Sequence, residues 1–224
     1  MSKQIQNSPL FVYFHVASMR YGRSIFKEIA RHIVSSKLNL TASEIHISVV
    51  GTKKMKISLP GNVYLHENSD LKRGEFITLQ LLESQAILTP QGKFLYIHTK
   101  GITKYWNRSI RDWRKYMTYF VVDNYAKCSE VLESNDACGV DLVSEPARHF
   151  SGNFWWARGD YINSLPRIKE ISAVDADAIL SLRHNAEFWI GMGDGKLVSL
   201  WNSGIDVYKR HLIRYKSSNY KRIP

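Results

Sequence analysis

Three polar side chains follow one short apolar run, and their chemistry suits the binding of a phosphate group. The apolar residues 94–97 are followed by His98, Thr99, Lys100 and Gly101. A buried strand ends in this way when its carboxyl edge opens onto a ligand site. An imidazole and an ammonium at that edge could bind an anion such as a phosphate. The alternative is a plain strand followed by a basic turn.

A second group of side chains, within residues 152–156, has types that bind sugars. Gly152 permits a positive φ or a close approach of the backbone, and Asn153 offers both a donor and an acceptor to sugar hydroxyls. Trp155 and Trp156 are adjacent, so on a strand their side chains point to opposite faces. One of them could line a cleft while the other packs in the core. The alternative is a core role for both.

A carboxylate in an apolar setting is a candidate general base. Glu187 precedes Phe188 and Trp189, and partial burial can tune the pKa of a carboxyl group for proton transfer. The alternative is a structural salt bridge with Arg183, one helical turn earlier. The Asp-x-Asp pattern at residues 175–177 is interpreted as the start of a helix, where acidic residues favour the helix dipole.

The hydrophobic pattern predicts the elements that would bring these side chains together. Strands are predicted at 9–16, 44–50, 63–66, the run from Phe94, 137–143 and 154–157, and helices at 23–35, 75–88 and 106–132, with a further short segment at 161–165. This alternation predicts an α/β fold with a mixed central sheet and helices on both faces. Ligands in such sheets bind beyond the carboxyl ends of the strands, which gathers His15, Gly51, residues 98–101 and Asp141 along one edge.

Composition limits the class of protein. The 224 residues suit one domain, and the net charge of +11 attracts anions such as nucleic acid, acidic membrane or phosphorylated small molecules. Cys128 and Cys138 imply no disulfide framework. The polar N-terminus lacks an apolar signal core, and no stretch approaches the ~18 apolar residues that would span a bilayer. These features predict a soluble protein of a reducing compartment, the cytoplasm.

The ends of the chain differ from its middle. We expect a flexible N-terminus at 1–8, one domain at 9–207 and a basic C-terminal tail at 208–224. The tail contains basic residues and no acid, so it could contact a membrane surface peripherally, or a nucleic acid. A solvated helix with a frayed end is the alternative.

Four segments together resemble a known enzyme family. Residues 94–101, 112–117, 151–156 and 186–191 are similar to a set of GT-A-type glycosyltransferases encoded by chlorella viruses, with relatives in bacterial polysaccharide clusters, and the likeness runs from about Phe11 to Asp206. The resemblance implies a single Rossmann-like domain that uses a nucleotide sugar, first of all a UDP-sugar, often with Mn²⁺ or Mg²⁺. It also implies a hydroxyl acceptor on a glycan or glycoprotein. For a viral protein the compartment would be the host cytoplasm.

The chain departs from this family at the metal site. GT-A enzymes usually place Asp-x-Asp at the end of the strand that here ends in His98, Thr99 and Lys100. Two arrangements are open. His98 could be a metal ligand through an imidazole nitrogen, or Lys100 could replace the charge of the metal in a metal-independent mechanism.

The resemblance and the strand-edge rule together assign roles to residues. Glu187 is the first candidate for the base that deprotonates the acceptor hydroxyl, Asp141 is the second, and a base in line with the leaving group predicts inversion. The other assignments are the nucleoside at His15, Val16, Ala17, Gly51 and Thr52, a ribose or sugar contact at Glu75, the diphosphate at His98, Thr99 and Lys100, and the sugar and acceptor pocket at Gly152, Asn153, Trp155 and Trp156.

Two other functions compete with glycosyl transfer. A basic nucleic-acid-binding module would explain the net charge, and its affinity would fall steeply with salt. The basic residues are not interleaved with aromatics in a recognisable RNA-binding pattern, so we expect no nucleic-acid partner. The third interpretation is an inactive sugar-binding relative that lost catalysis together with Asp-x-Asp.

Overall fold

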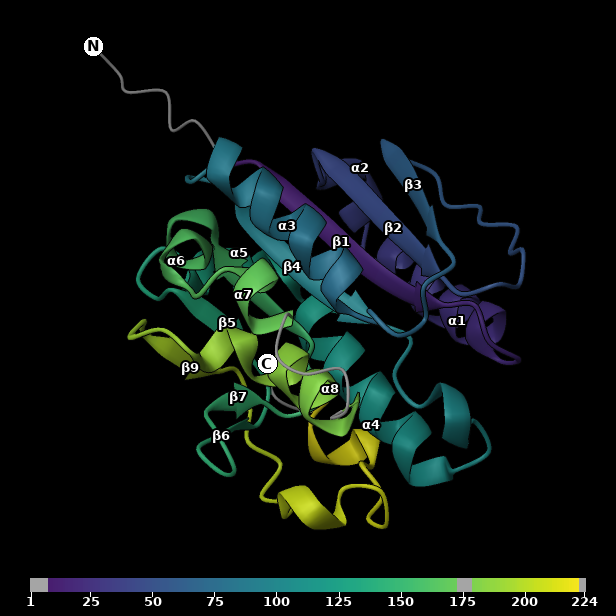
Figure 1. The fold of residues 1–224 in the computed structure, drawn as a ribbon. Coiled ribbons are helices and arrows are strands. Elements are labelled where there is room, and N and C mark those ends of the chain that lie inside the picture. Colours follow the sequence, from purple (N-terminus) through teal and green to yellow (C-terminus); the bar gives the residue numbers. More distant parts are fainter. Residues whose placement is uncertain (1–7, 173–178, 222–224) are drawn as a thin grey trace.

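A computed structural model describes residues 8–172 and 179–221 of the chain. Seven strands form one sheet in the order β3-β2-β1-β4-β8-β5-β9 (Figure 1). These strands are β1 (Leu10–Ala17), β2 (Glu44–Val50), β3 (Val63–Asn68), β4 (Lys93–His98), β5 (Ala137–Gly139), β8 (Trp155–Arg158) and β9 (Leu197–Ser199). A separate antiparallel pair joins β6 (Leu142–Val143) to β7 (His149–Phe150).

The sheet combines parallel and antiparallel pairs. Strands β3, β2, β1 and β4 run parallel to one another, whereas β8 lies antiparallel to both β4 and β5. The order of the first four strands is that of a Rossmann-like half, with the chain moving outward from β1 to β3 and then returning to the other side of β1 at β4. The predicted mixed sheet with a Rossmann-like arrangement is therefore confirmed.

Helices cover both faces of the sheet, as the alternating pattern predicts. The helices are α1 (Gly22–Ser35), α2 (Leu38–Thr41), α3 (Phe76–Leu88), α4 (Arg108–Thr118), α5 (Tyr125–Val131), α6 (Gly159–Ser164), α7 (Ile168–Ser172) and α8 (Ile179–Phe188). Helices α1, α4 and α5 pack on the face that carries Val12, Phe14 and Val16 of β1. Helices α3, α6 and α7 pack on the face of Phe11 and Tyr13. Successive side chains of β1 thus supply two separate cores.

The long helix predicted at 106–132 is wrong, because the structure divides it. Helix α4 is followed by a π-helical turn, Tyr119–Asp123, and then by α5. The indole Nε1–H of Trp156 donates to the Val121 carbonyl at 2.7 Å. A side chain that takes a backbone acceptor in this way interrupts the regular helical ladder. The predicted strand 137–143 is likewise broken, since Asp141 has φ 50° and separates β5 from β6.

The C-terminal segment folds onto the domain. Arg210, Tyr215 and Tyr220 are buried, and the segment is bonded to α4 by the Ser109 hydroxyl, which donates to the Leu212 carbonyl at 3.1 Å. Residues 208–221 therefore belong to the folded domain rather than to a free tail. Within the described residues, no helix combines the length and the apolar character that a membrane span requires.

Candidate functional site

A cleft of about 540 Å³ lies where the strand order reverses, beyond the carboxyl ends of β1 and β4. Its volume is within the range of small-molecule sites. Ala17, His98 and Lys100 line it from the strand ends, and Glu75 lines it from the start of α3. The sequence predicted a ligand edge at this place, and the structure brings these residues together there.

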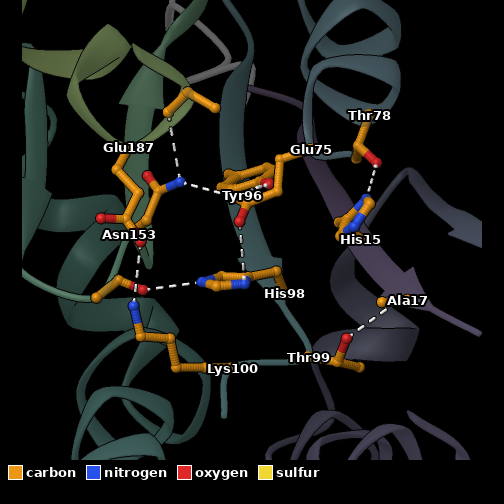
Figure 2. Close-up of polar contacts among 12 residues, drawn as sticks. His15, Ala17, Glu75, Thr78, Tyr96, His98, Thr99, Lys100, Asn153 and Glu187 are labelled. Carbon is orange, nitrogen blue, oxygen red and sulfur yellow. Dashed lines mark hydrogen bonds and ion pairs between the residues drawn. The ribbon is translucent and has the colours of Figure 1, made fainter. Parts of the chain in front are cut away.

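Strand alternation aims the polar side chains of β4 at helix α3. Tyr96 lies on the α3 face of the sheet, and His98 follows two residues later on the same face. Glu75, directly before α3, meets both (Figure 2). Its Oε2 accepts from the Tyr96 hydroxyl at 2.8 Å and from Asn153 Nδ2 at 2.8 Å, while its Oε1 lies 3.5 Å from His98 Nδ1. Glu75 is thus held by three side chains, two from β4 and one from the segment before β8, rather than left to turn toward solvent.

Both ring nitrogens of His98 face oxygen atoms of the protein. Nε2 lies 3.0 Å from the Gly152 carbonyl, which can only accept, so Nε2 carries a hydrogen. Nδ1 faces the Glu75 carboxylate. Across residues 8–172 and 179–221, no three His, Cys, Asp or Glu side chains gather into a metal-binding group. Within these described residues, the side chains of the cleft do not form a set of ligands that fits Mn²⁺ or Mg²⁺. Asp175 and Asp177 lie outside the described residues.

Lys100 supplies a positive charge to the lining of the cleft. Its Nζ donates to Glu187 Oε1 at 3.3 Å and lies 4.8 Å from the centre of the Trp113 ring. The side chains of Lys100 and Glu187 are 11% and 17% exposed, so the pair is sheltered but reachable. Figure 2 shows the two pointing toward each other from the end of β4 and from α8. The side chain of Arg183, expected as a partner of Glu187, lies outside the described part of the chain.

The gap between the ends of β1 and β4 is closed by direct bonds. Thr99 Oγ1 accepts from the Ala17 backbone N–H at 3.0 Å, and the Thr99 N–H donates to the His15 carbonyl at 3.0 Å. Thr99 therefore fixes the strand ends. Val16 is fully buried in the opposite core, which corrects the expectation of a nucleoside contact through its side chain. Thr52 is exposed and, like Gly51, is absent from the residues that line the cleft.

The predicted acceptor pocket at residues 152–156 is wrong. Trp155 and Trp156 point to opposite faces as expected, but both are buried in the two cores. Asn153 is fully buried and its amide is used internally, since its Oδ1 accepts from Trp155 Nε1 at 2.8 Å. Gly152 has the expected positive φ, 95°, and contributes its carbonyl to His98. These residues position Glu75 and His98 instead of contacting a ligand.

Asp141 is not a catalytic base in this structure. It is fully buried, its carboxylate forms an ion pair with Arg210, and it accepts from the Ser203 N–H at 2.6 Å and the Ser203 hydroxyl at 3.0 Å. A carboxylate with these bonds has a structural role, holding the C-terminal segment on the domain. The prediction of Asp141 as the second candidate for the base is therefore wrong.

Comparison with known proteins decides the family. The family described as "Domain of unknown function (DUF8361)" matches residues 20–191, well over half of the chain. The chain belongs to the DUF8361 family. The match includes Glu75, His98, Lys100 and Glu187, but neither His15 nor Arg210.

Other comparisons of this DUF8361 chain concern its fold. No curated protein matches it. Among solved structures, the crystal structure of 4-diphosphocytidyl-2C-methyl-D-erythritol synthase is similar, with a TM-score of 0.40 and 9% sequence identity, over 95% of this chain and 94% of the other.

Several cleft residues of the DUF8361 chain were not assigned to a ligand from the sequence. Arg73, three residues before the start of α3, and Lys104, in the turn after β4, line the cleft together with Trp113 and His211. Basic residues that flank a predicted strand end or helix start could have signalled Arg73 and Lys104. His211 had no such signal, because it comes from the C-terminal segment.

Burial and neighbouring groups together set the pKa values in this cleft. Burial alone would raise the pKa of Glu75, but His98, His15, the Tyr96 hydroxyl and Lys100 lower it to about 2. Burial lowers the pKa of His15 to about 4, although Glu75 opposes the shift, and His98 shifts it further down. Burial also lowers the pKa of His98. Glu75 is therefore ionised, and His15 neutral, at neutral pH.

We expect the stability of this DUF8361 chain to fall between pH 6.5 and 4 because of His15. The unfolded chain binds a proton at His15 near pH 6.5, whereas the folded chain resists it until about pH 4. The contribution of His15 to stability is thus complete above pH 6.5 and lost as the pH falls through 4, and it amounts to about 3 kcal/mol.

Denaturant unfolding of wild type and His15→Asn at several pH values checks this, and the variant should show the shallower loss. His184→Asn, at an exposed position, is the control that should keep the wild-type slope. Equal slopes for wild type and His15→Asn would contradict the expectation.

Proposed function

We propose that this chain is a GT-A-type glycosyltransferase that moves a sugar from a nucleotide sugar, first of all a UDP-sugar, to a hydroxyl of a glycan or glycoprotein. One observation carries the proposal. A lysine ammonium and a glutamate carboxylate lie 3.3 Å apart beside a cleft at the point where the strand order reverses. The cation suits a diphosphate leaving group, and the carboxylate suits an acceptor hydroxyl.

The cations of the cleft supply the stabilisation of the leaving group. When the bond between sugar and phosphate breaks, negative charge develops on the departing diphosphate. Lys100 lies at the end of β4, and Lys72, Arg73 and Lys104 line the cleft around it. Fixed positive groups there stabilise the transition state more than the ground state, because the charge grows as the bond breaks.

Lys100 can serve both partners of the reaction. An ammonium has three N–H donors, so Lys100 can keep its bond to Glu187 while it donates to a phosphate oxygen. Glu187 then accepts the proton of an acceptor hydroxyl that approaches the anomeric carbon from the side opposite the leaving group. This arrangement leads to inversion at that carbon.

We expect Lys100→Met to weaken UDP binding by roughly 10-fold to 100-fold, the range that the loss of a hydrogen bond to a charged group produces. Isothermal titration with UDP measures the change. Lys56→Met, at an exposed position in the loop between β2 and β3, removes the same charge away from the cleft and should bind UDP as the wild type does. Unchanged affinity in Lys100→Met would remove Lys100 from the phosphate site.

A direct experiment tests the reaction itself. The protein is screened by thermal shift against UDP, GDP and CMP, and then incubated with the matching nucleotide sugars and hydroxyl acceptors, with release of the nucleotide and formation of the glycoside measured together. Stabilisation by one nucleotide and turnover of its sugar are the expected results. Absence of both for every nucleotide would reject the proposal, and binding without turnover would point to an inactive relative.

A further inference from the structure

One surface beside the cleft combines exposed cations with exposed apolar side chains. The apolar members are Trp106, Tyr208, Leu212 and Ile213, which are 77%, 69%, 68% and 41% exposed. The basic members are Lys104, Arg108, Arg111, Lys115, Lys209 and Lys216, all exposed. We call this set of residues the α4 face, because α4 and the segment packed on it supply most of its members.

Direct bonds show that the two segments of the α4 face lie side by side. Asn107, next to Trp106, donates through Nδ2 to the His211 carbonyl at 3.1 Å. The Ser109 hydroxyl donates to the Leu212 carbonyl, and Arg214 forms an ion pair with Asp112. Figure 1 shows the yellow C-terminal segment beside α4.

The C-terminal segment exposes the apolar side chains of Leu212 and Ile213. Arg210 points inward to the buried Asp141, and the chain turns tightly around it, with the Leu212 and Ile213 N–H groups donating to the Lys209 carbonyl at 2.9 and 3.2 Å. The buried Arg210 side chain fixes this turn to the domain. Leu212 and Ile213 are therefore exposed on an ordered part of the surface.

The charge of the α4 face is strongly one-sided. Asp112 is the one acidic residue in the sequence ranges 104–115 and 208–221, and it is occupied by Arg214. Asp206, the nearest acid before the second range, caps the turn by accepting from the Tyr208 N–H at 2.8 Å. The face thus presents positive charge around an apolar centre.

We propose that the α4 face docks the protein on an anionic lipid bilayer. Lysine and arginine near a bilayer are attracted by its negative surface potential, tryptophan and tyrosine favour the interface, and exposed aliphatic side chains insert among the acyl chains. A nucleic acid fits less well, because bases stack on aromatic side chains and not on Leu212 or Ile213.

The docking surface adjoins the cleft. Lys104 and His211, which line the cleft, belong to the same two segments as the α4 face. A docked molecule would therefore present its cleft close to the bilayer, and the acceptor hydroxyl would be carried by a membrane-held molecule. This statement about the acceptor rests on the proposed function, whereas the docking does not.

Vesicle co-sedimentation tests the docking without any nucleotide sugar, so docking and sugar transfer can fail independently. Wild type should sediment with vesicles of mixed phosphatidylcholine and phosphatidylglycerol and not with phosphatidylcholine alone. The triple variant Arg108→Gln, Arg111→Gln, Lys115→Gln should partition at least about tenfold less. The control Lys53→Gln, Lys54→Gln, Lys56→Gln carries the same net charge and should bind as the wild type does.

A second pair of variants tests the apolar part. Leu212→Ser with Ile213→Ser should lose the binding that persists at high salt, since salt screens charge but not apolar insertion. Leu40→Ser with Leu88→Ser, at positions 74% and 77% exposed elsewhere on the domain, should retain it. Circular dichroism and the unfolding midpoint verify that each variant is folded.

Three results would overturn the docking. The first is a wild type that ignores anionic vesicles at low salt. The second is an equal loss of binding in the triple variant and its charge control, which would indicate net charge alone. The third is binding of a single-stranded oligonucleotide through the α4 face without any binding of vesicles.

Discussion

Replacing Glu187 with glutamine is expected to lower the rate of sugar transfer at least about 100-fold, the usual scale of general base catalysis. The amide cannot accept the proton of the acceptor hydroxyl, yet it has the same shape and can still bond to Lys100. Glu187 lies 3.3 Å from Lys100 Nζ, and because glutamine can keep this bond, the nucleotide sugar should bind nearly as before. The loss should therefore fall on kcat, with UDP affinity changed little.

Steady-state kinetics and UDP titration on the same preparation separate the two effects. Glu170→Gln, at an exposed site on α7, makes the same chemical change outside the cleft and should leave turnover intact. Near-normal kcat in Glu187→Gln would show that Glu187 is not the base. A large loss of UDP affinity with normal kcat would make it a binding residue.

The second large effect concerns stability. Asp141→Asn should destabilise the fold by about 3–5 kcal/mol, because breaking a buried ion pair leaves the other charge without compensation. Arg210 is 3% exposed and pairs with Asp141. Asparagine tolerates the left-handed conformation that Asp141 adopts at φ 50°, so the variant removes the charge while it retains the backbone. Urea unfolding measures the change.

A double variant distinguishes the charge from the geometry. Asp141→Asn with Arg210→Met removes both charges and should recover part of the lost stability, since the orphaned guanidinium is gone. Glu145→Gln, at an exposed position near Asp141 in the chain, should unfold at the wild-type midpoint. A loss below 1 kcal/mol in Asp141→Asn would show that solvent reaches Arg210 and relieves its charge.

The parts of the fold that follow from local pattern were predictable. The period of two in β1 separates Val12 and Phe14 from Phe11 and Tyr13, and each set fills its own core. The strand-edge rule placed His98 and Lys100 beside a cleft because the order of the parallel strands requires it. Glu75 was included for its place near a helix start, and the structure puts it against His98.

The errors arose where a residue depends on a distant partner. Asp141 was a candidate base because the sequence does not reveal its partner. That partner is Arg210, 69 positions later in the chain. The helix predicted at 106–132 is divided at a π-helical turn, where the Trp156 indole, from β8, donates to the Val121 carbonyl. Asn153 has the composition of a sugar ligand, but its bonds to Trp155 and Glu75 use it fully inside the protein. Sequence spacing carries no information on such pairings.

The buried side chain of Arg210 limits how far this chain can be shortened at its C-terminal end. A run of charges near a terminus invites trimming before crystallisation or fusion to a tag. Removal of the residues from 210 onward would leave Asp141 buried without its ion-pair partner. It would also remove Tyr215, whose ring stacks on Trp113 with the ring centres 6.2 Å apart. The shortened protein would also lose His211 from the lining of the cleft, so an absence of activity in it would not test the proposed function of the full chain.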